Sequence, residues 1–217
     1  MKDKTLKVKP IPVPLGYIHP PPPNDILPRH EFSMGLIAPK GSGKTTVICN
    51  MLKFYKGYFH SIIVFSPTVA SDEKWDFVKK QNLLTDNVKL KEWVKKMREK
   101  EKKERMKKLP IVEKLDVDLD EFADIDVEPL DDFTIPEDCF YSDYCQETLE
   151  GIMNEQMKLV KLLKKYDKSK HLANRILFIF DDLVGSLLFS NARGNCFKKL
   201  NTNHRHYSAS LLMVTQA

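Results

Sequence analysis

The sequence has little of what marks secreted, disulfide-rich or membrane proteins. Its 217 residues include four cysteines, none of them in a C-x-x-C pair, so neither a zinc site nor a disulfide framework is indicated. No apolar run approaches the length of a membrane span, and the first residues lack the hydrophobic segment of a secretory signal. We therefore expect an intracellular protein in a reducing setting, with no membrane among its partners.

The net charge is also small, at +5, but the charges are segregated along the chain. Residues 1–30 are a proline-rich lead that cannot form a helix, so we expect an extended arm that is either loose or laid on a neighbour. Residues 31–217 suit one domain with an ordinary core, carrying a charged insertion at about 70–174. In it, Lys89–Lys108 holds eleven Lys/Arg against four Glu, whereas Leu115–Met157 holds fifteen Asp/Glu and no Lys/Arg.

The two charged runs leave their roles open. The basic run is rich in helix formers, and its apolar residues Leu90, Trp93, Val94 and Met97 form a stripe over its first half only. It is either a solvated helix that pairs with the acidic run or a surface that contacts phosphates. The acidic run is typical of a partly disordered segment or a docking strip, and it would repel DNA. Helical apolar spacing returns at residues 146–166.

The stretch APKGSGKTT is typical of a phosphate-binding loop. It follows the apolar run Phe32–Ala38, which predicts a buried strand, and it leads into Thr45–Tyr55, whose apolar spacing predicts a helix. Ala38 stands where the P-loop pattern has its first Gly, and the triplet Gly-Lys-Thr at 43–45 completes the pattern. Strand, glycine-rich loop and helix form the context in which such a loop binds a nucleotide.

In that context the backbone N–H groups of the loop face phosphate oxygens. Lys44 would reach the outer phosphates, and the hydroxyl of Thr45 would bind Mg²⁺. The predicted nucleotide-binding residues are Ala38, Pro39, Lys40, Gly41, Ser42, Gly43, Lys44, Thr45 and Thr46.

A second motif ends the apolar run Ile176–Phe180, which predicts a central strand buried on both faces. An acid at the end of such a strand is the Walker B arrangement, so we expect Asp181 to hold Mg²⁺. Asp182 would orient or deprotonate the attacking water, as a catalytic residue. The alternative for Asp182 is a cap of the following helix.

A third motif lies at the end of the sequence, where the apolar run Leu211–Val214 leads into Thr215 and Gln216. Ligands of open α/β sheets bind at the carboxyl ends of strands. Gln216 is therefore placed to sense a γ-phosphate or to position a water. Arg205, just upstream, could reach a phosphate on a neighbouring subunit, with Arg193 as the reserve candidate.

The stretches APKGSGKTT, ILFIFDDL and RHYSASLLMVTQ together resemble the poxvirus-type genome-packaging ATPases of the FtsK/HerA superfamily, found in large cytoplasmic DNA viruses and related integrated elements. The resemblance implies a RecA-like, additional-strand ATPase core that forms a homo-oligomeric ring and uses ATP and Mg²⁺ to move double-stranded DNA into a capsid. It also implies capsid or portal proteins as partners, and a location in the host cytoplasm or in association with the virion.

Motif-level resemblance covers residues 32–69 and 175–217. It assigns the Walker A roles to Lys44 and Thr45, the Walker B roles to Asp181 and Asp182, the strand-end glutamine to Gln216 and the arginine finger to Arg205. The family's domain continues with at least one more helix and strand, the strand lying beside the P-loop strand. We therefore expect the chain to be truncated or to be completed by another segment.

Two other interpretations of the P-loop remain open. One is a P-loop kinase or a GTPase-like switch that translocates nothing, although the Asn-Lys-x-Asp stretch that recognises guanine is absent from the sequence. The other is a decayed fragment of an integrated viral ATPase gene, against which the intact motifs argue.

The expected fold is α/β, a three-layer P-loop NTPase sandwich around a mostly parallel sheet. Its core strands are predicted near Phe32–Ile37, Ile62–Phe65, Ile176–Phe180 and Leu211–Val214.

Overall fold

The computed structural model describes residues 19–79, 84–108, 138–166, 174–183, 186, 188, 190 and 194–216, and it contains one five-stranded sheet. The strands are β1 (Ser33–Ile37), β2 (Ser61–Phe65), β3 (Phe140–Tyr141), β4 (Ile176–Asp181) and β5 (Ala209–Thr215). The helices are α1 (Lys44–Phe54), α2 (Lys74–Lys79), α3 (Leu84–Lys108), α5 (Gln146–Lys165), α6 (Cys196–Asn203) and the 3-10 turn η6 (His204–Tyr207).

The strand order is β1-β5-β4-β2-β3, and every pair is parallel. The predicted parallel α/β sheet and its four core strands are therefore confirmed, with bounds that differ by up to two residues. Strand β3 was not expected from the sequence, because its two residues are too few to show a period. It extends the sheet beside β2, within the part of the chain interpreted as an insertion.

Side chains alternate between two cores along the central strands. In β4, Phe178 belongs to one core, and its neighbours Leu177 and Ile179 belong to the other. In β2, Ile63 and Ile62 divide in the same way. This alternation explains the unbroken apolar runs in the sequence, since a strand buried on both faces needs an apolar residue at every position.

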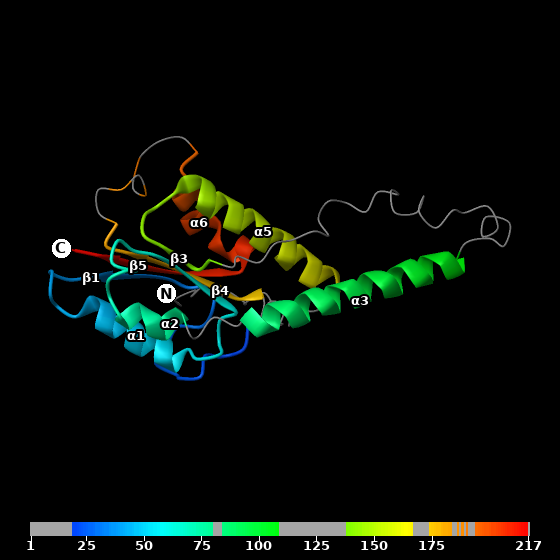
Figure 1. Ribbon diagram of the computed structural model, residues 1–217, viewed down its shortest axis with the longest axis horizontal. Coiled ribbons are helices and arrows are strands. Elements are labelled where there is room, and N and C mark those ends of the chain that lie inside the picture. The colour runs from blue at the N-terminus through cyan, green and yellow to red at the C-terminus, as the bar shows by residue number, and fades with distance from the viewer. Residues whose placement is uncertain are drawn as a thin grey trace, which may run out of the picture.

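Helices cover both faces of the sheet and give three layers (Figure 1). On one face, α1 buries Ile48 and Leu52, and α2 adds Trp75. On the other face, α5 contributes residues such as Leu149 and Met153, together with buried residues of α6. The helix expected after the glycine-rich loop and the one expected at residues 146–166 are both confirmed.

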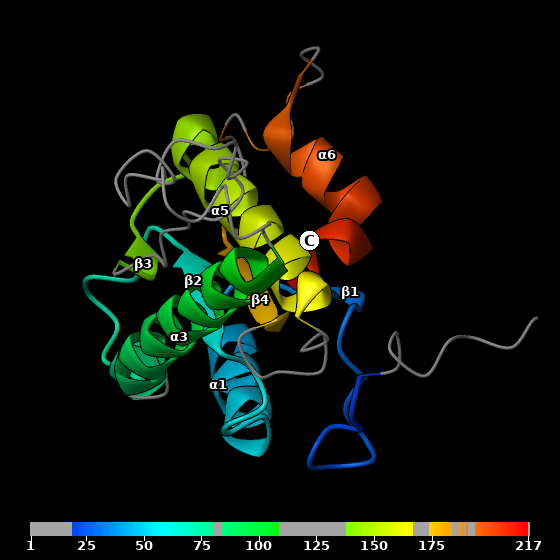
Figure 2. The ribbon, with the colours of Figure 1, turned by 90° about the vertical axis from the view of Figure 1, so that its right-hand side faces the viewer.

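The long helix α3 packs against α5 and projects from the body (Figures 1 and 2). Leu90 and Val94 are buried against α5 residues Leu159, Leu162 and Leu163. The basic run is therefore a helix whose apolar stripe packs against α5, a contact that was not predicted from the sequence. The distal half of α3 carries no such apolar contacts among the described residues.

The described part of the proline-rich lead, from residue 19 on, lies against aromatic residues at the end of α1. The hydroxyl of Tyr55 donates to the carbonyl of Pro28 at 2.7 Å, and the hydroxyl of Tyr58 donates to that of Pro20 at 2.8 Å. Proline offers a carbonyl acceptor but no N–H donor, so tyrosine hydroxyls suit it as partners. Residues 1–18 of the expected arm lie outside the described part.

Two further observations concern membrane spans and cysteine pairing among the described residues. No helix among them is both long enough and apolar enough to cross a bilayer. All four cysteines are described and all are free.

Candidate functional site

The carboxyl ends of four neighbouring strands bring the predicted site residues to one edge of the sheet. Ile37 at the end of β1 pairs with Thr215 at the end of β5, and Asp181 at the end of β4 pairs with Val214. Residue 66 directly follows the end of β2, which pairs with β4. The loop after β1, the acids after β4 and Gln216 after β5 therefore lie side by side, at the edge where parallel α/β sheets bind ligands.

The loop between β1 and α1 is tight. Gly41 and Gly43 have φ values of 77° and 84°, a left-handed conformation that glycine adopts without steric cost. Gly43 is also the N-cap of α1, and no side chain caps this helix start. The backbone N–H groups of the first turn are therefore not satisfied by a side-chain cap, and such groups attract anions.

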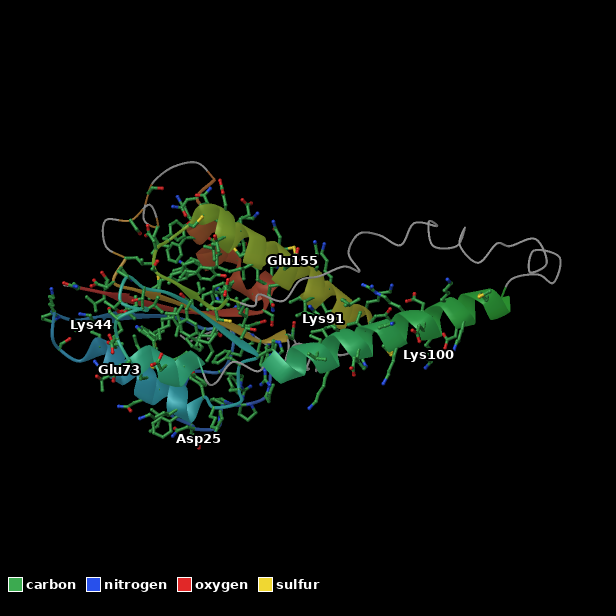
Figure 3. The ribbon with its side chains drawn as sticks, in the orientation of Figure 1. Asp25, Lys44, Glu73, Lys91, Lys100 and Glu155 are labelled. Atoms are coloured by element: carbon green, nitrogen blue, oxygen red, sulfur yellow. The ribbon has the colours of Figure 1, made fainter. Side chains whose placement is uncertain are left out.

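Lys44 is the first residue of α1 and lies over this loop (Figure 3). Its ammonium donates to the carbonyl oxygens of Ala38 and Pro39, at 2.8 and 3.0 Å. The lysine side chain thus bonds acceptors of the loop itself, beside the uncapped N–H groups. Thr45 follows it on α1 and is half-buried.

Asp181 is almost completely buried, with 4% of its surface exposed. Burial raises its pKa above the ordinary value, the hydrogen bond from Ser66 opposes that rise, the charge of Asp182 adds to it and the charge of Lys44 opposes it. Ser66 Oγ donates to Asp181 Oδ2 at 3.0 Å. A buried carboxylate with one neutral donor is incompletely compensated, and a bound cation would supply the missing charge.

Asp182 and Gln216 form the closest polar contact of the site. The amide nitrogen Nε2 of Gln216 lies 2.7 Å from both carboxylate oxygens of Asp182. Asp182 has φ 52°, and its own N–H donates to the carbonyl of Val214 at 3.0 Å. A left-handed residue other than glycine costs on the order of 1–2 kcal/mol, so the surrounding strands hold Asp182 in this conformation. The alternative role of Asp182 as a cap of the following helix concerns residues 183–189, most of which lie outside the described part of the chain.

Arg205 is not brought to this edge. It is exposed in η6, which precedes β5, whereas Gln216 follows β5. The seven residues of β5 span about 20 Å at the usual rise of a strand. Arg205 therefore cannot contact the Asp182–Gln216 pair of its own chain through this strand. Arg193 lies outside the described residues.

A different polar cluster lies at the opposite edge, near the start of β5. Among the described residues, one group has ligand atoms close enough for a metal ion, namely His19, His30 and Glu31, within 4.8 Å of one another. Both ring nitrogens of His30 already have partners, Ser210 Oγ at 2.8 Å and Ser208 Oγ at 3.2 Å. Burial lowers the pKa of His30 to about 2, which keeps it neutral. These contacts describe a hydrogen-bond network that fixes the lead to the sheet.

Sequence reasoning missed Ser66 as a member of the site. Ser66 is fully buried, and it bonds both Asp181 and the hydroxyl of Thr68. The available signal was its place directly after a buried strand, the same signal that identified Asp181 and Gln216. Comparison with family models, with curated proteins and with solved structures finds no match for this chain.

Proposed function

We propose that this chain is a Mg²⁺-dependent P-loop ATPase of the RecA-like type that acts as a DNA-translocating motor. The observation that carries the proposal is the meeting of three features at one sheet edge: an uncapped helix start with Lys44, a buried Asp181, and the Asp182–Gln216 pair. Each feature separately is common. Together they offer an ammonium and N–H groups that can bind phosphates, and oxygen ligands that can bind a cation. They also offer a carboxylate in a fixed position that can orient a water.

The residues fit Mg²⁺ and a nucleoside triphosphate. Mg²⁺ prefers oxygen ligands and retains several waters, so one or two protein oxygens suffice. The Thr45 hydroxyl and the Asp181 carboxylate would be those ligands, and the buried, undercompensated charge of Asp181 favours a cation there. When bound, Mg²⁺ neutralises charge that develops on the transferred phosphoryl group. The preference for adenine comes from the family resemblance.

The side chains of this chain would divide the remaining work. Lys44 would exchange its two carbonyl partners for phosphate oxygens, and the first-turn N–H groups of α1 would bind the same anion. Asp182 would orient a water for attack, because its carboxylate is held at a fixed angle by Gln216. Gln216 would also lie near the terminal phosphate, so the contacts of Gln216 would change when that phosphate is lost.

The motor role belongs to the same proposal and is supported by the resemblance of the three motifs. It includes a homo-oligomeric ring, double-stranded DNA as the translocated substrate, a capsid or portal protein as docking partner, and a place in the host cytoplasm or in the virion. The separation of Arg205 from the site within one chain agrees with a role across a subunit boundary, since only a neighbour could then supply it.

The direct test is nucleotide binding and hydrolysis with and without Lys44. Lys44→Ala should weaken Mg-ATP binding by about 10²-fold, because it removes a charged phosphate contact. The matched control is Lys53→Ala, which removes the same charge from the last turn of the same helix. Fluorescent-nucleotide titration and phosphate release measure both effects. Equal behaviour of the two variants, or no binding by the unaltered protein, would overturn the proposal.

A further inference from the structure

The helix α3 presents charge in a fixed orientation. Its first half is anchored on α5 through Leu90 and Val94. Farther along, Glu101 continues this anchorage, because it accepts a hydrogen bond from the Tyr166 hydroxyl at 2.8 Å and pairs with Lys165 at 3.4 Å. The described contacts therefore hold one face of α3 from residue 90 to residue 101. A partner that binds the other faces of this stretch would therefore not lose free energy to ordering the helix.

A stripe of one charge sign follows a different face of α3. Lys91, Lys95, Arg98 and Lys102 succeed one another at spacings of four, three and four residues, which places them on one side of a helix. The three lysines are exposed and Arg98 is half-buried. At 1.5 Å per residue the stripe is about 16 Å long. We call these four residues the basic stripe.

The described acids of α3 form no ion pair with this stripe. Glu101 is engaged with Lys165 and Tyr166, and Glu104 lies 4.0 Å from Lys100, which is outside the stripe. Lys91, Lys95 and Lys102 have no ion pair or hydrogen bond with any described residue. Glu92 and Glu99 are exposed on the same helix but form no ion pair with the stripe, whose four cations exceed these two acids and create a local positive potential.

We propose that the basic stripe binds the phosphate backbone of double-stranded DNA. Duplex DNA carries about one negative charge per 1.7 Å of its axis, so a stripe about 16 Å long can lie along roughly ten phosphates. The stripe offers only lysine and arginine, with no acceptors or exposed aromatics among its members, so it would contact phosphates rather than read bases. This inference rests on the proposed motor function, for which it names a DNA-contacting surface.

The stripe lies apart from the nucleotide site. Figure 3 shows Lys44 at one end of the molecule, whereas Lys91 and Lys100 follow α3 toward the other end. Substitutions in the stripe therefore leave the loop, Asp181 and the Asp182–Gln216 pair untouched. DNA binding and nucleotide hydrolysis can then be tested separately on the same protein.

The experiment measures binding of a fluorescein-labelled 30-base-pair duplex by anisotropy, between about 50 and 200 mM salt. The test variant combines Lys91→Ala, Lys95→Ala and Lys102→Ala, which preserve helix propensity. We expect its affinity to fall by about 10²-fold or more at 0.1 M salt, and the slope of log K against log salt to decrease in magnitude by roughly three. A second variant with Gln at the same positions guards against an effect of side-chain loss, and circular dichroism reports the helix.

The matched control removes three exposed lysines from other helices and turns: Lys56→Ala, Lys198→Ala and Lys199→Ala. It has the same net charge as the test variant and should lose less than about threefold in affinity. Equal losses in the two triple variants would overturn the inference, because net charge alone would then explain binding. An unchanged affinity in the test variant would overturn it as well.

Two further measurements separate the competing outcomes. Poly-glutamate replaces DNA in the same assay, and stripe-dependent binding of poly-glutamate without binding of the duplex would assign the stripe to an acidic protein partner instead. ATP hydrolysis is measured without DNA on each preparation. Stripe-dependent DNA binding without hydrolysis by the unaltered protein would refute the motor function but support the stripe, whereas hydrolysis with stripe-independent DNA binding would refute the stripe alone.

Discussion

Removal of Gln216 tests whether this residue positions the Asp182 carboxylate for catalysis. The amide of Gln216 contacts both carboxylate oxygens of Asp182 at 2.7 Å, so it fixes the rotation of the carboxylate as well as its position. A misplacement of a catalytic group on the order of 1 Å costs about 10²-fold in rate. Gln216→Ala should therefore lower kcat for ATP hydrolysis by about 10²-fold, equal to about 2.7 kcal/mol. KM should change little, because the phosphate-binding loop is intact.

A double variant decides how the two side chains cooperate. Asp182→Asn alone should lower kcat by about 10³-fold, within the usual range for loss of a general base. If Gln216 acts only by holding Asp182, the double variant falls no further than Asp182→Asn, since nothing remains to be held. Independent action would instead multiply the losses to about 10⁵-fold.

The assay is steady-state phosphate release at saturating Mg-ATP for the four proteins, with binding measured in parallel. Gln146→Ala is the control, because it removes an exposed glutamine whose amide contacts the carbonyl of Gly194 rather than the site. A multiplicative loss in the double variant, or a weakened nucleotide affinity in Gln216→Ala, would refute the positioning role.

Two more predictions concern protonation and subunit contact. Burial lowers the pKa of His30 to about 2, from an ordinary value of 6.5, with His19 adding to the shift. Between these values only the unfolded chain takes up the proton, so stability falls as pH falls, by about 2 kcal/mol from pH 7.5 to 5. Urea denaturation should show this loss reduced in His30→Gln and retained in the exposed-residue control His206→Gln; an unchanged loss in His30→Gln contradicts it. Separately, Arg205→Ala should reduce ATP hydrolysis by roughly 10³-fold if the arginine acts in trans. Mixing Arg205→Ala with Lys44→Ala subunits should then restore part of the activity, and rings shown to be mixed but inactive at every ratio would exclude this role.

The sequence predicted those parts of the fold that depend on burial along a single segment. The runs that form β2 and β4 are largely apolar because both faces of the sheet are covered. Such a run can be recognised in the sequence alone. The glycine-rich loop is similarly local, since Gly41 and Gly43 are needed for a left-handed backbone. The parallel topology then follows, and with it the common edge of the site.

What could not be predicted depends on contacts between distant segments. The hydrogen bond from Ser66 to Asp181 joins residues that are 115 positions apart, and serine is common after strands. The left-handed backbone of Asp182 has no sequence signal, because aspartate is accepted in many conformations. Arg205 was expected to act on the site of a neighbouring subunit, and contacts within one chain, where β5 separates it from Gln216, do not test that prediction.

The helix α5 has a mechanical consequence. Its first half is packed into the sheet through residues such as Leu149 and Met153, and its second half grips α3 through Leu159, Leu162 and Leu163. A straight helix of 20 residues is about 30 Å long and stiff along its axis. A force applied to the projecting end of α3 would therefore rotate α5. That rotation would act on the sheet face that carries Phe178 and Phe180, next to Asp181.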